Sequence, residues 1–227
     1  MKPDILMILA AGRGKRMKHL TDEQPKPLVR VLGRSLLDRV IDHAVQSDIN
    51  QIVINTCYKG KMIEDSLKTR TDVSITFSRE QEALETGGGV LNALPLLLPQ
   101  GKNGFFVANA DPLWVDKTNT IFEQLSCKWN PDKMDVLLAL IPKENAFGAV
   151  HGGDYHIIND IPSRKKKKKK KQTIFIQVFK FYIHVFSVVL SKVYSAWFDC
   201  MIRPNNLADC TQSSLMEIGI MSEPPRL

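Results

Sequence analysis

The chain has few cysteines, and none is spaced for a disulfide framework or a metal site. Its 227 residues include four, namely Cys57, Cys127, Cys200 and Cys210. They are far apart in the sequence and form no C-x-x-C pair of the kind that marks zinc or redox sites. No cleavable secretory signal is recognisable at the N-terminus. We therefore expect a reducing, cytoplasmic setting for this protein.

A clean apolar run of about 20 residues, as a membrane-spanning helix requires, is also missing from the sequence. The strongest candidate extends from Thr173 to Phe186, but Lys180 and His184 interrupt it. Cations placed before an apolar stretch are nevertheless typical of membrane anchors. A membrane span is therefore not expected, and a basic tail that tethers the chain to a membrane stays open as an alternative.

The net positive charge of the chain comes from one short run of residues. The formal net charge is +7, yet residues 1–163 contain 19 Lys+Arg and 20 Asp+Glu. The remaining residues, 164–227, contain 12 Lys+Arg and 4 Asp+Glu. The excess comes from the consecutive cations Arg164 to Lys171 and not from a basic surface on the domain. No nucleic-acid partner is expected, because such partners are indicated by basic residues spread over one face of a domain.

Two common phosphate-binding signatures are incomplete near the N-terminus. The apolar run Ile5–Leu9 predicts a strand buried on both faces, and a turn containing Gly12 and Gly14 follows it. The dinucleotide fingerprint requires a third glycine where this chain has Met17. The P-loop requires Ser or Thr after Gly-Lys, where this chain has Arg16. Both signatures are therefore excluded.

The turn does contain the residue types that bind a polyphosphate. Backbone N–H groups of a glycine-rich turn close on phosphate oxygens, and nearby cations add favourable charge. The candidate nucleotide-binding residues are Ala11, Gly12, Arg13, Gly14 and Lys15, and Arg16 is a candidate catalytic residue. Lys26, between Pro25 and Pro27, is predicted to lie on a stiff, non-helical segment and to suit the α-phosphate of a nucleotide. A basic turn with no ligand is the structural alternative.

Two later segments add candidate residues. Gly87-Gly88-Gly89 precedes a helical pattern and would let a planar base approach the backbone. Asp111 follows a buried strand and suits Mg²⁺, which binds phosphate oxygens together with one or two carboxylates. Asn109 suits sugar or ribose hydroxyl groups. Each segment also has a structural interpretation: a tight strand-to-helix connection for the glycines, a turn or helix cap for Asp111, and a strand-end cap for Asn109.

Predicted strands and helices alternate along residues 1–163. The strands are Ile5–Leu9, Gln51–Asn55, Val73–Phe77, Phe105–Asn109 and Met134–Ile141, and the helices run from Leu36 to Ala44, Lys61 to Leu67, Val90 to Leu94 and Thr118 to Leu125. Such alternation predicts an α/β fold with a doubly wound, mainly parallel, Rossmann-like sheet. Ligands of these sheets bind beyond the carboxyl ends of the strands, where the candidate segments would meet.

The string A-A-G-x-G-x-R-M, followed by P-K-P-L, resembles the sugar-1-phosphate nucleotidyltransferase superfamily. Residues 85–89 (E-T-G-G-G) and 109–111 (N-A-D) are most similar to the bacterial N-acetylmuramate α-1-phosphate uridylyltransferases of cell-wall recycling. The resemblance implies that a nucleotidyl group passes from a nucleoside triphosphate, UTP, to a sugar-1-phosphate with release of pyrophosphate, and that Mg²⁺ is the cofactor. The implied roles are catalytic for Arg16 and Lys26, nucleotide-binding for Gly87 and Gly88, sugar-binding for Glu85 and Asn109, and metal-binding for Asp111.

Two alternatives remain beside this assignment. One is an enzyme similar to the mannose-1-phosphate guanylyltransferases, which share the first loop. The other is a non-catalytic nucleotide-binding module with a basic, membrane-tethering tail. The sequence predicts no particular oligomeric state.

The tail from residue 172 does not continue the resemblance. Seven consecutive lysines imply a long run of A in the gene, where a base is easily lost. Read one nucleotide earlier, the codons for residues 173–187 permit Y-T-G-I-Q and those for residues 216–225 permit V-G-T-P, both similar to segments of the same superfamily. We therefore predict an incomplete nucleotidyltransferase domain at residues 1–163, a poly-Lys run at 164–171 and a non-native or disordered, out-of-frame tail at 172–227. The chain as printed is expected to be inactive.

Overall fold

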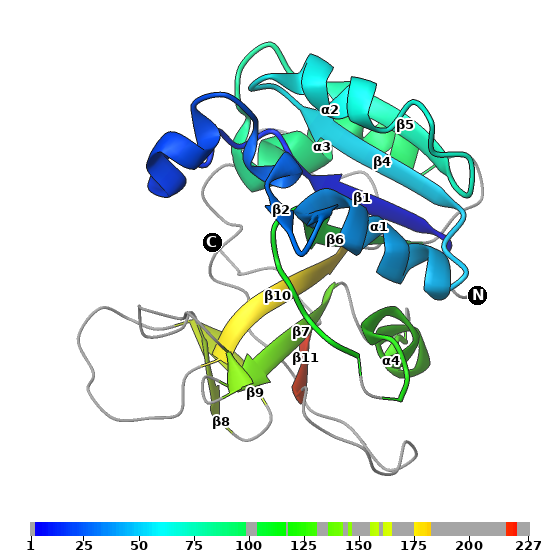
Figure 1. Ribbon diagram of the computed structural model, residues 1–227. Helices are drawn as coiled ribbons and strands as arrows, with labels where there is room; N and C mark the ends of the chain where they lie inside the picture. Colours follow the sequence, from blue (N-terminus) through cyan, green and yellow to red (C-terminus); the bar gives the residue numbers. More distant parts are fainter. Residues whose placement is uncertain are drawn as a thin grey trace. The chain divides into compact units, whose positions relative to one another are not determined.

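Four parallel strands form the sheet of the first unit, residues 1–123, in the computed structural model (Figure 1). The strands are β1 (Ile5–Leu9), β4 (Gln51–Thr56), β5 (Ser74–Arg79) and β6 (Phe105–Asn109). Their order across the sheet is β6-β1-β4-β5, which confirms the predicted α/β fold with a mainly parallel sheet. The structure describes residues 3–98, 104–116, 118–130, 136–142, 145–146, 155–158, 161–164, 175–182 and 217–221.

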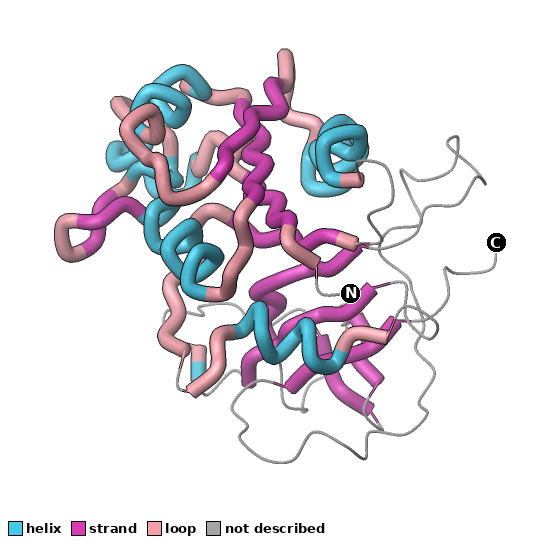
Figure 2. Tube along the Cα trace, turned by 90° about the vertical axis from the view of Figure 1, so that its right-hand side faces the viewer, coloured by secondary structure: helices cyan, strands magenta, loops and turns pink. Residues whose placement is uncertain are grey.

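Helices cover both faces of this sheet. Two of them, α1 (Leu36–Gln46) and α2 (Gly60–Ser66), connect β1 to β4 and β4 to β5, and α3 (Glu85–Leu97) connects β5 to β6. In Figure 1, α1 lies in front of the sheet and α3 behind it, and Figure 2 shows helices on either side of the strands. The chain reverses direction across the sheet after β5, so right-handed crossovers place α3 on the face opposite α1.

The connection from β1 to α1 holds four short elements and a helix cap. These elements are the 3₁₀ helices η1 (Lys15–Thr21) and η2 (Lys26–Leu28) and the strands β2 (Arg30–Val31) and β3 (Arg34–Ser35), which form a small hairpin. The α1 helix begins after Ser35, whose Oγ accepts a hydrogen bond of 2.9 Å from the Asp38 amide. Such a bond satisfies an N–H group that the first turn of a helix leaves without a partner, and it confirms the predicted start of this helix.

The central strands supply the core of the first unit. Ile5, Leu6, Met7 and Ile8 of β1 are fully buried, as expected of a parallel strand covered by helices on both faces. On β6, Phe106 meets Phe122 of α4 (Ile121–Lys128) edge-on, with 5.1 Å between the ring centroids. The predicted bounds of these two strands are confirmed.

The register of the sheet aligns the carboxyl ends of its strands. Leu9, the last residue of β1, lies opposite Asn55 of β4 and opposite Asn109 of β6. The strand order reverses between β1 and β6, and a reversal of this kind marks the crevice in which doubly wound sheets bind their ligands. The loop after β1 and the residues after β6 therefore lie on either side of this crevice.

The second unit, residues 124–227, is built around β7 (Val136–Pro142). This strand pairs antiparallel with β10 (Phe175–Tyr182) and with β11 (Glu217–Met221). A further antiparallel pair is formed by β8 (Tyr155–Ile158) and β9 (Ile161–Arg164), and β8 also pairs with β10. Antiparallel pairing distinguishes this unit from the parallel sheet of the first.

Two segments of the predicted tail are strands in the structure. Residues 172–227 are expected to be non-native or disordered, yet β10 and β11 lie within that range. The segment Phe175–Tyr182 is rich in aromatic and β-branched residues, which favour extended structure, and β7 pairs with it through the backbone. These two segments are therefore not disordered, and their strands do not bear on whether the tail is non-native. The lysines 165–171 and the rest of the tail lie outside the described residues, and the out-of-frame origin stays a prediction.

Candidate functional site

The loop after β1 has the open geometry that phosphate binding requires. A Cβ added to Gly12 would meet no atom within 4 Å, whereas Ala11 is buried beneath the loop. The guanidinium of Arg13 lies over the ring of Tyr58, with 5.2 Å between its Cζ and the ring centroid. The side chains of Lys15 and Arg16, two more of the predicted residues, lie outside the described residues.

Gly14 packs directly against Lys26. Its φ of +69° is left-handed, and an added Cβ would lie 2.8 Å from the Cβ of Lys26. Lys26 itself begins η2, preceded by an extended Pro25. The prediction that Lys26 lies on a non-helical segment is therefore wrong in part. Pro27 fits the first turn of a 3₁₀ helix, because an N–H group there would have no partner within the helix. The loop and the lysine form one packed unit.

The ammonium group of Lys26 forms an ion pair with the carboxylate of Asp111, two residues after β6. The two side chains are 30% and 33% exposed, so both are partly accessible to solvent. The fold thus joins two predicted site residues that are 85 positions apart in the sequence. The pair places one positive and one negative group where the loop after β1 faces the end of β6.

Asp111 fits a magnesium ion that is held mainly by phosphates. Within the described part of the chain, no three His, Cys, Asp or Glu side chains form a group able to hold a metal. Mg²⁺ is commonly bound through one or two carboxylates together with substrate phosphates, and it does not need a cage made only of protein ligands. A single accessible carboxylate at the end of a strand satisfies that requirement.

The glycine triplet lies inside a helix and does not precede it. Helix α3 begins at Glu85, five residues before the predicted start, so Gly87, Gly88 and Gly89 belong to its first turns. A Cβ on Gly88 would lie 2.9 Å from the Cβ of Leu84, and one on Gly89 would lie 2.7 Å from Asn55 Nδ2. Close packing therefore explains two of the three glycines. Contact of Gly87 and Gly88 with a base stays a prediction.

The two predicted sugar-binding residues are exposed at the same edge of the sheet. Glu85 opens α3 with a φ of +59°, which is unusual for a residue with a Cβ. Asn109 is the last residue of β6. The amide of the next residue, Ala110, donates a backbone hydrogen bond of 3.2 Å to the carbonyl of Leu9. Both side chains have the polar groups and the exposure that contact with a sugar hydroxyl requires.

Two buried polar residues near the site, Asn55 and Glu80, were not predicted from the sequence as site residues. Asn55 Oδ1 accepts a hydrogen bond of 2.7 Å from the Ala10 amide, and Asn55 Nδ2 donates one of 2.8 Å to Glu80 Oε1. A signal was present, because an asparagine ends the otherwise apolar run Ile52–Ile54 of β4. Buried polar side chains of this kind are almost always hydrogen-bonded.

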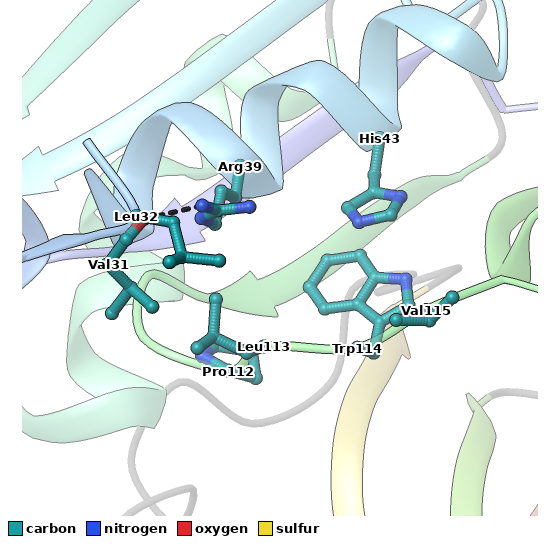
Figure 3. A pocket seen from close by; sticks show the side chains of 8 residues that line it. All are labelled: Val31, Leu32, Arg39, His43, Pro112, Leu113, Trp114 and Val115. Carbon is teal, nitrogen blue, oxygen red and sulfur yellow. Dashed lines mark hydrogen bonds between the residues drawn. The ribbon is translucent and has the colours of Figure 1, made fainter. Parts of the chain in front are cut away.

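A separate cavity lies beside the chain that follows Asp111 (Figure 3). It has a volume of about 240 Å³, and its lining includes Leu32, Arg39, His43 and the segment 112–115. The His43 ring stacks on Trp114 with 4.3 Å between centroids, and its Nδ1 lies 3.0 Å from Asp116 Oδ2. The lining is largely apolar, and none of the predicted site residues contributes to it.

No helix in the described ranges is both long enough and apolar enough to span a membrane.

Comparisons with known proteins agree with the geometry of the first unit. The model of the nucleotidyl transferase family matches residues 5–193. The N-acetylmuramate alpha-1-phosphate uridylyltransferase of Caulobacter vibrioides is 37% identical over 163 residues, which are 70% of this chain and 66% of that protein. The D-glycero-alpha-D-manno-heptose 1-phosphate guanylyltransferase of Aneurinibacillus thermoaerophilus is 30% identical over 155 residues, 67% of this chain and 64% of that protein. The chain thus spans about two thirds of the length of these relatives.

Among solved structures, the HddC protein of Yersinia pseudotuberculosis, complexed with GMP-PN, has a TM-score of 0.60 and 22% identity. The match covers 79% of this chain and 76% of that one. At this identity the likeness concerns the fold alone, and it agrees with a Rossmann-like sheet.

Proposed function

Because this chain belongs to the nucleotidyl transferase family, we propose that its site transfers a nucleotidyl group, UMP from UTP, to a sugar-1-phosphate. The products would be a nucleotide sugar and pyrophosphate. The observation that supports this best is the ion pair between Lys26 and Asp111 at the crevice, packed against Gly14. It brings a phosphate-binding cation and a metal-binding carboxylate to the loop after β1.

The reaction needs alignment and charge neutralisation more than proton transfer. A sugar-1-phosphate is already an anionic nucleophile, so the protein has to hold it in line with the α-phosphorus. Lys26, fixed by η2 and by Gly14, supplies charge at the α-phosphate, where negative charge develops as pyrophosphate leaves. The amides and cations of residues 11–16 suit the β- and γ-phosphates, and Gly87 and Gly88 suit the base. Glu85 and Asn109 suit the hydroxyl groups of the sugar or the ribose.

Asp111 is the residue of this chain that would hold Mg²⁺ together with the phosphates. When bound, the ion neutralises phosphate charge and orients the triphosphate. Without nucleotide, the carboxylate is neutralised by Lys26. Arrival of a triphosphate gives Lys26 a phosphate partner, which leaves Asp111 able to bind the cation.

UTP is proposed as the donor because the relatives with the higher identity, 37% and 38%, are named as N-acetylmuramate alpha-1-phosphate uridylyltransferases. N-acetylmuramate α-1-phosphate, the substrate in the name of these relatives, is therefore the first acceptor to test. The guanylyltransferase relative at 30% identity makes GMP transfer the second candidate. Magnesium dependence, a role in peptidoglycan recycling and a cytoplasmic location belong to the same proposal.

The activity of the printed chain depends on its tail. We keep the hypothesis that residues 1–163 are an incomplete nucleotidyltransferase domain followed by the lysine run and an out-of-frame tail. The match to the Caulobacter relative covers 70% of this chain, whereas the family model extends to residue 193, beyond the lysine run. The printed chain would then bind nucleotide weakly and turn over little, whereas a chain whose gene has one A added to the lysine codons would be active.

The test is pyrophosphate release from UTP, CTP or GTP with N-acetylmuramate α-1-phosphate and Mg²⁺, measured on the printed and the frame-restored chains. We expect release with UTP by the frame-restored chain, and Lys26→Ala should slow it by about 10²-fold or more, the usual effect of removing a transition-state charge contact. Lys61→Ala is the matched control, because Lys61 also forms a lysine–aspartate pair, with Asp65, but on the surface of α2.

The other outcomes separate the alternatives. Faster turnover with GTP would replace UMP by GMP in the proposal. Nucleotide binding without pyrophosphate release by the frame-restored chain would favour the non-catalytic module. Equal turnover by the printed and the frame-restored chains would refute the hypothesis about the tail.

A further inference from the structure

We infer that Asn55 and Glu80 are positioning residues that fix the spacing between the two segments proposed to hold the nucleotide. These segments are the loop after β1 and the start of α3. The inference rests on the proposed function, because it concerns how the same site is held in shape. Neither residue belongs to the signature strings in the sequence, and both are buried.

The first contact of this network holds the loop after β1. Asn55 Oδ1 accepts a hydrogen bond of 2.7 Å from the amide of Ala10, the first residue after the strand. Since Leu9 and Asn55 are paired in register, the side chain reaches this amide without leaving its strand. The Asn55 side chain therefore sets the direction in which the chain enters Ala11 and Gly12.

The second contact holds the start of α3. Glu80 is the residue after β5, and both oxygens of its carboxylate accept hydrogen bonds. Oε1 accepts from Asn55 Nδ2 at 2.8 Å, and Oε2 accepts from the Leu84 amide at 3.0 Å. Glu80 is itself anchored by a backbone bond of 2.8 Å from its amide to the Thr56 carbonyl. Leu84 directly precedes Glu85, where α3 begins, so this bond fixes the entry into the helix.

Gly89 of α3 packs directly against the hydrogen-bonded pair of Asn55 and Glu80. A Cβ at this position would lie 2.7 Å from Asn55 Nδ2 and 2.8 Å from Glu80 Oε1, so α3 can approach the hydrogen-bonded pair only with glycine there. Asn55 is 2% exposed and Glu80 is 8% exposed. Because a buried polar group that loses its partner pays its full cost of desolvation, the pair tolerates little displacement of either segment.

The chemistry of the pair allows a test by exchange of its polar groups. Asn55→Asp places a second carboxylate against Glu80, and Glu80→Gln gives the side chain only one oxygen for two donors. In the double variant, which combines Asn55→Asp with Glu80→Gln, the introduced carboxylate would accept from the Ala10 amide and from the introduced amide group. The oxygen of that amide group would accept from Leu84. Every hydrogen bond and the net charge of the pair are then restored.

The measurement is the dissociation constant of UTP with Mg²⁺ by calorimetry on the full frame-restored chain, alongside the melting temperature. We expect binding at least about tenfold weaker, or about 1.4 kcal/mol, for Asn55→Asp. The double variant should lie within about threefold of the unsubstituted chain. Asn92→Ala is the control, because the side chain of Asn92 in α3 donates to Ser78 of β5 at 3.0 Å, a bond that involves neither the loop after β1 nor Leu84 at the start of α3. It should lower the melting temperature and leave UTP binding unchanged.

Two results would overturn the inference. If Asn55→Asp lowers the melting temperature as Asn92→Ala does and leaves UTP binding unchanged, the pair stabilises the fold without positioning the site. If the double variant binds as weakly as Asn55→Asp, the exchange of hydrogen bonds is not what matters. Absence of UTP, CTP and GTP binding by the unsubstituted chain is a different failure, since it refutes the proposed function and removes the site that the pair would position.

Discussion

Substitution of Gly14 by alanine should damage both the stability and the site of this protein, whereas the same change at Gly12 should damage the site alone. Gly14 has a φ of +69°, and an added Cβ would lie 2.8 Å from the Cβ of Lys26. Gly12 has no atom within 4 Å of the corresponding position. Two glycines separated by one residue therefore form a matched pair.

The magnitude follows from the backbone and the contact. A residue with a Cβ in the left-handed region costs about 1–2 kcal/mol relative to glycine. The short contact adds to this cost, because the Cβ of Lys26 belongs to η2 and cannot rotate away as the end of a side chain can. For a chain of this size, about 1–2 kcal/mol corresponds to a fall of about 2–8 °C in Tm. Gly12→Ala should leave Tm unchanged within about 1 °C or raise it slightly, because alanine restricts the unfolded chain.

Binding of UTP with Mg²⁺ separates the two variants in a second way. Both should bind more weakly, Gly12→Ala because a methyl group stands where phosphate approaches the backbone, and Gly14→Ala because Lys26 is displaced. Thermal unfolding and calorimetry on the same preparations measure the two effects. An unchanged Tm for Gly14→Ala would refute the packing argument, and unchanged nucleotide binding by Gly12→Ala would refute the assignment of the loop.

Three further predictions concern stability. Glu85→Gly should raise the free energy of unfolding by about 0.5 kcal/mol in urea denaturation, because the φ of +59° strains a residue with a Cβ by slightly more than the added chain entropy of glycine costs; a loss of stability would contradict this. Ser35→Ala should lower the same free energy by about 1 kcal/mol through loss of the N-cap of α1, and an effect near zero would count against the cap. Burial would raise the pKa of Asp42, but hydrogen bonds from Arg34 and Arg70 outweigh it and hold that pKa below its ordinary value. Their stabilising effect is therefore present above about pH 4 and lost as the pH falls through the lowered pKa, so Asp42→Asn should lose less stability on acidification than the unsubstituted chain.

The sequence alone determined the elements whose signals are local. The run Ile5–Leu9 is apolar at every position, and only a strand buried on both faces suits such a run. Ser35 before an amphipathic segment predicted the start of α1, since capping depends on residues three positions apart. The string around Gly12 indicated the family only through its resemblance to a known signature, while the backbone amides and cations of this short loop by themselves predicted a phosphate site.

Other features depend on contacts between distant segments, and only the tertiary structure decided them. The ion pair of Lys26 with Asp111 requires that β6 lie beside β1, and a strand order is not written in any single segment. Helix α3 starts at Glu85 and includes the glycines, although glycine disfavours helix. Glycine occupies position 89 because close packing against Asn55 leaves no room for a Cβ there. Local propensity set the strands and caps of this protein, while register and packing set which side chains meet at its site.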